Sequence, residues 1–200
     1  IEFLNSAVLI VEEGATLNIG KNVTIRGSEN HKIVVRGSIN IDENTTLEPF
    51  SGNRYFGGIE IAEESTNALF TKANFRKTNL LNHGQNLSVE LCTFTNCESI
   101  QSVSGNLNVN GSQFSNSLLS VSNSTLITEY IAAIHGCKFS SNQNHNSIEI
   151  QGYGNYSISS NTISNSLNGI ALFYSGKGTG GNHLISNNTI SDCTESAVTL

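Results

Sequence analysis

The sequence predicts an all-β parallel solenoid, and three observations carry this prediction. First, a polar phrase returns almost unchanged, as SSNTIS at 159–164 and SNNTIS at 186–191. Second, the short stretches between such phrases alternate apolar and polar residues, which is the pattern of a β-strand. Third, no stretch keeps apolar residues at i, i+3 and i+4, so we expect little or no helix.

The repeated phrase contains an apolar anchor that returns along the second part of the chain. The anchors are Phe75, Phe94, Phe114, Phe139, Ile163 and Ile190. Alternating stretches lie between them, at 87–91, 107–111, 147–151 and 169–173. A period of roughly 20–27 residues, repeated several times, indicates a repeat architecture.

The segment 1–65 repeats in a different way. LIVEEGATLNIGKNVTI at 9–25 is echoed by IVVRGSINIDENTTL at 33–47, with Gly14 and Gly37 at matching places. We therefore expect one domain over 1–200, with glycine-punctuated coils over 1–65 and Phe/Ile-Ser-Asn coils over 66–200. Both ends, IEFLNSAVLIV and ESAVTL, are patterned as ordinary strands, which predicts a segment of a longer protein.

Among repeat architectures, a single-stranded parallel β-helix fits best. A β-sandwich has no reason to repeat residues in register, a leucine-rich repeat would show its Leu/Asn consensus, and a propeller needs longer blades. In a β-helix each period is one coil, and coils stack ~4.8 Å apart with equivalent residues above each other. We expect about eight coils in a rod on the order of 40 Å long, right-handed by the general preference of parallel crossovers.

This architecture explains the polar residues of the phrase. Asn96, Asn116 and Asn165 follow their anchors by two positions, and Asp192 holds the same place. Asn tolerates the bends between strands, and stacked amides can hydrogen-bond to one another in a ladder. We expect the anchors to form one internal stack and these residues to form the corners.

The four cysteines fall in repeat positions that otherwise hold small residues. Cys92 and Cys137 come two positions before an anchor, and Cys97 and Cys193 come three positions after one. Their spacing is not that of a zinc site. Small buried thiols are the favoured interpretation, and a Cys92–Cys97 disulfide remains an alternative.

Composition excludes several classes of partner. The formal charge is −6, with 10 Lys and Arg against 16 Asp and Glu. Nucleic acids and anionic membrane surfaces attract dense positive charge, so neither is an expected partner. No apolar run approaches the ~20 residues of a membrane span, so we expect no membrane insertion.

Motifs for nucleotide binding or catalysis are weak in this chain. The glycines of SGKGTGG at 175–181 match G-x-G-x-x-G, but the next coil follows where a nucleotide site needs a helix. The only aspartates, Asp42 and Asp192, lie far apart in coil order, whereas glycoside hydrolysis needs paired carboxylates. The five histidines lack metal-ligand spacing. We predict no catalytic residue, no metal and no cofactor.

Two groups of side chains remain as surface features. Lys72, Arg76 and Lys77 are the densest basic group, and Glu63 and Glu64 nearby predict a surface ion network.

Tyr153, Tyr156 and Tyr174 fall at or just beyond strand ends in consecutive coils, where they would line one edge. Aromatic rings on an outer face suit carbohydrate, so these three are the candidate ligand-binding residues, with loop packing as the alternative.

The repeats resemble a known group of proteins. VEEGATLNIGKNVTI, VRGSINIDENTTL and YFGGIEIA are similar to the opening of β-helix regions in large secreted or surface proteins of Bacteroidetes-type bacteria. The NTISN coils resemble the parallel β-helix repeat of pectate lyase-like proteins. Phe56 stands where that pattern usually has Trp, and the Asp-rich signatures of pectate lyases have no match.

The resemblance implies a right-handed β-helix and export, and it transfers no catalytic residue. The first functional hypothesis is a non-catalytic structural or adhesive module of a secreted or cell-surface protein, with a polysaccharide or cell-surface glycan as partner. The alternative is a polysaccharide lyase or glycoside hydrolase of the pectate lyase-like class whose catalytic residues lie outside this segment or are not identifiable in it.

Overall fold

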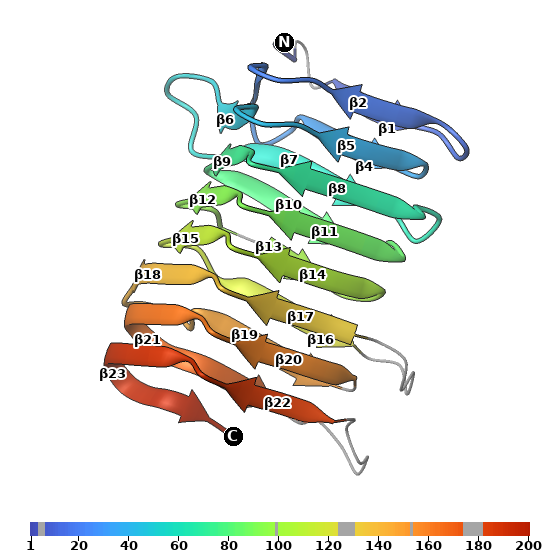
Figure 1. Cartoon of the computed structure of the whole chain (residues 1–200). Helices are drawn as coiled ribbons and strands as arrows, with labels where there is room; N and C mark the ends of the chain where they lie inside the picture. The colour runs from blue at the N-terminus through green and yellow to red at the C-terminus, as the bar shows by residue number, and fades with distance from the viewer. Residues whose placement is uncertain (4–6, 99, 124–130, 153, 174–181) are drawn as a thin grey trace.

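The computed structural model shows a parallel β-solenoid, and every strand pair in it is parallel (Figure 1). The structure describes residues 1–3, 7–98, 100–123, 131–152, 154–173 and 182–200. It contains no helix in these ranges. The chain winds in the expected right-handed sense. The predicted fold class is therefore confirmed.

One side of each coil belongs to an eight-strand sheet. Its strands, in spatial order, are β2 (Thr16–Ile19), β5 (Ser38–Ile41), β8 (Asn67–Thr71), β11 (Asn86–Glu90), β14 (Asn106–Asn110), β17 (Ile131–His135), β20 (Asn155–Ser159) and β22 (His183–Ser186). From β2 to β20, each strand pairs with the strand three places later in the chain, and β20 pairs with β22. The chain therefore passes once around the coil between paired strands.

The other two sides form a fifteen-strand sheet made of two rows. The first row is β1 (Val8–Val11), β4 (Lys32–Val35), β7 (Phe56–Ile61), β10 (Thr78–Asn82), β13 (Ile100–Ser102), β16 (Leu119–Asn123) and β19 (Ile148–Gly152). The second is β3 (Thr24–Gly27), β6 (Thr46–Pro49), β9 (Asn74–Arg76), β12 (Thr93–Thr95), β15 (Gln113–Ser115) and β18 (Lys138–Asn142). The long strands β21 (Thr162–Phe173) and β23 (Thr189–Thr199) join the rows.

The predicted anchors form one continuous internal row. Phe75 and Phe94 stack with ring centroids 4.7 Å apart, Phe94 and Phe114 at 4.8 Å, and Phe114 and Phe139 at 4.5 Å. Strand pairing extends the row to Ile163 and Ile190. Aromatic stacking adds to the hydrophobic gain from burying these rings.

The row also continues into the glycine-punctuated coils. Ile25 pairs with Leu47, and Leu47 pairs with Phe75. Residues from Ile25 to Ile190 thus make seven coil-to-coil steps, so the solenoid has about seven turns rather than the eight expected.

The corners have the backbone conformation that the repeated Asn predicts. Asn96, Asn116, Asn165 and Asp192 have φ of 53°, 48°, 54° and 54°. This left-handed region favours Asn and Asp over most other non-glycine residues. The Asn116 amide donates to the Asn96 side-chain oxygen at 2.9 Å, which confirms a ladder between these two coils.

A second corner row lies inside the coil and carries polar side chains. Cys92 N–H donates to Ser112 Oγ at 3.0 Å, and Cys137 N–H donates to the Asn161 side-chain oxygen at 2.8 Å. The Asn161 amide in turn donates to the Ile134 carbonyl at 3.0 Å. Buried polar groups need such partners, so small polar residues recur at this position.

Candidate binding surface

Of the three candidate tyrosines, the structure places one. Tyr153 and Tyr174 lie outside the described residues. Tyr156 lies in β20 with 2% of its surface exposed, and its ring stacks on that of His183 at 5.0 Å. Strand alternation turns Tyr156 and Ile158 inward, so the Tyr156 ring belongs to the core and offers no platform to a glycan.

The outer surface of the eight-strand sheet carries a row of mostly polar side chains. Strand register places Asn18, Asn40, Leu69, Ser88, Asn108, Ala133, Ser157 and Leu184 in one row across all eight strands. The Asn40 amide donates to Asn18 Oδ1 at 2.8 Å, and the Asn106 amide donates to Asn86 Oδ1 at 3.2 Å. Amides therefore link neighbouring coils on this surface.

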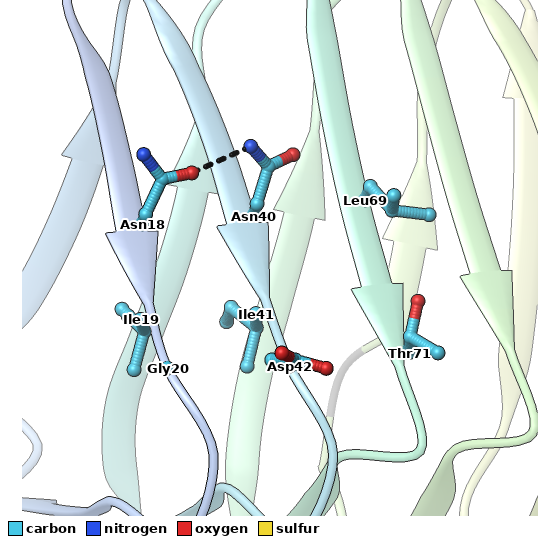
Figure 2. A pocket seen from close by; sticks show the side chains of 8 residues that line it. All are labelled: Asn18, Ile19, Gly20, Asn40, Ile41, Asp42, Leu69 and Thr71. Carbon is cyan, nitrogen blue, oxygen red and sulfur yellow. Dashed lines mark hydrogen bonds between the residues drawn. The ribbon is translucent and has the colours of Figure 1, made fainter.

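A first shallow depression lies over β2, β5 and β8, with a volume of about 310 Å³. In Figure 2 the hydrogen-bonded side chains of Asn18 and Asn40 stand beside Leu69, and Asp42 lies near Thr71 at the strand ends. The depression combines amide donors and acceptors with the apolar side chains of Ile19, Ile41 and Leu69. Asp42 is the single charged residue in its lining.

A second depression, of about 410 Å³, lies over β8, β11, β14 and β17. Asn67, Asn86, Asn106 and Asn108 supply its amides, and Ile131, which is 51% exposed, supplies an apolar contact. No charged residue lines it. Both depressions touch β8, the first at Leu69 and Thr71 and the second at Asn67, so their linings together span six strands. We call this surface the amide face.

The described carboxylates are mostly paired with other side chains. Glu43 accepts hydrogen bonds from Lys21 at 2.8 Å and Lys72 at 3.4 Å, which lower the pKa of its carboxyl. Glu149 accepts from Asn146 at 3.0 Å. No three His, Cys, Asp or Glu residues among those described come together in an arrangement that could hold a metal.

Three of the four thiols confirm the interpretation of the cysteines as small buried residues, and Cys193 is half-buried. All four are free, and Cys92, Cys97 and Cys137 are buried. Burial raises the pKa of Cys92 and of Cys137 to about 11. Because the thiolate is the reactive form, these groups act as small core residues.

Comparison with family models, characterised proteins and solved structures gives no significant match. The described residues also contain no helix that could cross a membrane. The function must therefore be inferred from the fold and its surfaces.

Proposed function

We propose that this chain is a non-catalytic β-helical module that binds an extended, neutral polysaccharide along the amide face. The observation that carries the proposal is the band of two depressions across six parallel strands. Neighbouring strands lie ~4.8 Å apart, so the in-register pairs of Asn18 with Asn40 and of Asn86 with Asn106 present amides at that spacing. A polymer with repeated hydroxyl groups can satisfy such pairs, because each amide offers both donors and an acceptor.

The composition of the band favours a neutral ligand. Its linings contain Asn side chains, several apolar residues such as Leu69 and Ile131, and Asp42 as the only charge. Ligand sites commonly combine apolar contact with a few polar groups that fix orientation. The depressions are shallow, which suits a chain that lies along the surface more than a small molecule that is enclosed.

The cellular setting forms part of the same proposal. Low charge, abundant Asn, Ser and Thr, and the resemblance to β-helix regions of secreted Bacteroidetes-type and pectate lyase-like proteins support a place outside the cell. There the solenoid would act as a rigid structural or adhesive element.

A neutral-glycan array, followed by titration of the best ligand, tests the proposal. Asn40→Ala and Asn106→Ala should each weaken binding at least ten-fold, because each removes amide contacts from one depression. Gln101→Ala is the matched control, since Gln101 is exposed on β13, in the other sheet. No binding to any neutral glycan, or equal losses in all three variants, would contradict the assignment.

The enzymatic alternative and the two tyrosines outside the described residues have their own tests. Incubation with uronic-acid polymers should yield no unsaturated products, and a robust signal would favour a lyase. Tyr153→Ala and Tyr174→Ala should leave binding unchanged if the amide face alone holds the glycan.

A further inference from the structure

A loop at residues 50–55 leaves the regular stack between β6 and β7 and stands out from the body of the coil (Figure 1). Its base is fixed, because Phe50 N–H donates to the Gly27 carbonyl at 2.8 Å. The Phe50 ring also meets the buried His31 ring edge-on at 6.0 Å. Asn53 N–H closes a turn on the Phe50 carbonyl at 3.0 Å, with Gly52 at φ +87°. Glycine adopts this conformation without strain.

This loop forms one wall of a pocket of about 440 Å³, which we call the corner pocket. The opposite wall comes from the ends of β9 and β12, where Arg76, Lys77, Thr95 and Asn96 line the space. The volume falls within the range of small-molecule sites, roughly 300–1,000 Å³. Ser51 and Asn53 add polar groups from the loop.

The corner pocket differs in charge from the regular stack of the first three coils. There Lys21, Arg26, Lys32, Arg36 and Lys72 all form ion pairs with glutamates, while Arg54 of the 50–55 loop lies over the Tyr55 ring at 5.2 Å. Arg76 and Lys77 are exposed, and within the described ranges neither forms an ion pair.

One carboxylate, that of Glu48, also lines the corner pocket. Its oxygen accepts a hydrogen bond from Arg26 at 2.9 Å, so its charge is already balanced. The pocket is therefore a positive site in a chain whose formal charge is −6.

We infer that the corner pocket binds an oxyanion group, a sulfate, phosphate or carboxylate, carried on a small ligand. Arg presents a planar fork that matches oxyanions, and Lys adds a mobile point charge. Hydroxyl and amide groups of Ser51, Asn53 and Thr95 suit the uncharged part of such a ligand. This site is separate from the amide face, which lies on the other sheet and is nearly free of charge.

The solenoid itself supplies a variant that removes both charges and preserves the fold. Arg76 pairs in register with Thr95, and Lys77 occupies the same corner position as Asn96 in the next coil. Lys77 has φ 47°, which Asn adopts more readily than Lys. The double variant Arg76→Thr, Lys77→Asn therefore copies the sequence of its neighbour and should fold.

Lys138→Gln gives a matched control. Lys138 is exposed on β18 and pairs in register with Gln113, so this change also copies a neighbouring coil. It removes one positive charge away from the corner pocket. The single variants Arg76→Thr and Lys77→Asn also remove one positive charge each, but inside the corner pocket. Comparing their affinities with that of Lys138→Gln separates the loss of a pocket contact from the change in net charge.

Isothermal titration with inorganic sulfate, inorganic phosphate, and a disaccharide with and without a sulfate group tests the inference. We expect the original chain to bind the sulfated disaccharide more tightly than the unsulfated one, with affinity that falls as sodium chloride rises. The double variant should lose at least ten-fold in affinity, while Lys138→Gln should change little. Circular dichroism should show the same β structure in every variant.

Three results would overturn the inference. They are no binding of any of these oxyanions, equal affinity for the sulfated and unsulfated disaccharides, and an equal loss in Lys138→Gln and in Arg76→Thr or Lys77→Asn. Inorganic sulfate and phosphate carry no sugar, so Asn40→Ala and Asn106→Ala should leave their binding unchanged. This arm of the experiment therefore tests the corner pocket independently of the proposed glycan function.

Discussion

Two regions of the solenoid, the first three coils up to Lys72 and the later coils from Phe75 onward, use different interactions between neighbouring coils. All six ion pairs among the described residues lie between positions 2 and 72, and each reaches across the outside surface from one coil to the next. From Phe75 to Phe139, four phenylalanine rings instead stack in the interior.

The buried corner row shows the same contrast. In the early coils Thr45 makes one bond there, from its hydroxyl to the Gly20 carbonyl at 2.8 Å. In the later coils Asn161 both accepts from Cys137 and donates to the Ile134 carbonyl. A parallel β-helix thus needs matching residues in successive coils more than any particular type of interaction. Exposed ion pairs contribute little, about 0–1 kcal/mol each, so we expect the inner rows to dominate stability.

The largest effect should come from the aromatic stack. Phe114 is 1% exposed and stacks on both neighbours, so Phe114→Ala should lower the free energy of unfolding by about 3–5 kcal/mol. Phe114→Leu keeps most of the apolar volume and should lower the free energy of unfolding by about 0.5–1.5 kcal/mol through lost stacking. Denaturant unfolding followed by circular dichroism measures both.

Leu47→Ala is the comparison from the early coils, since Leu47 holds the same row and is fully buried. It should cost about 2–5 kcal/mol. A loss below about 1 kcal/mol for Phe114→Ala, far under the usual cost of such a truncation, would show that the ring stack is not a principal source of stability.

An intermediate effect should follow from the buried amide of Asn161, which is 1% exposed. Asn161→Ala removes the hydrogen-bond partner of the Cys137 N–H and of the Ile134 carbonyl. Each of these groups that stays unsatisfied should lower the free energy of unfolding by about 1–3 kcal/mol. Thr45→Val, which removes a single bond in the early coils, should cost about 1 kcal/mol. The same unfolding measurement compares the two variants. Equal losses of unfolding free energy would show that the buried corner row contributes equally to stability in the early and the later coils.

The smallest effect should come from Glu43→Gln, because the ion pairs with Lys21 and Lys72 are exposed. Hydrogen bonds from these lysines lower the pKa of Glu43 below its ordinary value of 4.5. The stabilising contribution is therefore present above that value and is lost as the pH falls through the lowered pKa. Unfolding midpoints of the original chain and Glu43→Gln should converge in that acidic range and in high salt. If the two unfolding midpoints still differed at acidic pH and in high salt, the stabilising effect of Glu43 would not be electrostatic.

Periodicity was sufficient to predict the interior of the solenoid. The anchor row, the corner Asn residues and the small, free thiols all follow from repeated positions, because stacked coils place equivalent residues in equivalent environments. Ile25 and Leu47 were not predicted as anchors, because the sequence motif around them in the early coils differs from that of the later coils.

The surfaces were harder to predict, for physical reasons. Tyr156 lies within a strand and faces the core, whereas its sequence position suggested a strand end. Lys72 pairs with Glu43 of the preceding coil, while Glu63 and Glu64 form no ion pair with the basic group in the described ranges. Contacts across coils depend on register and on the path of loops such as 50–55, which local composition does not encode.

The coil-to-coil register also has an evolutionary consequence. Leu87 and Leu107, like Phe94 and Phe114, are one period apart in the chain and adjacent in space. A segment one period long begins and ends in the same surroundings, so its duplication or loss in the gene changes the rod by one whole turn. No internal row is interrupted when this happens. The length of the molecule, and with it the number of strands in the eight-strand sheet, can therefore change without redesign of the core.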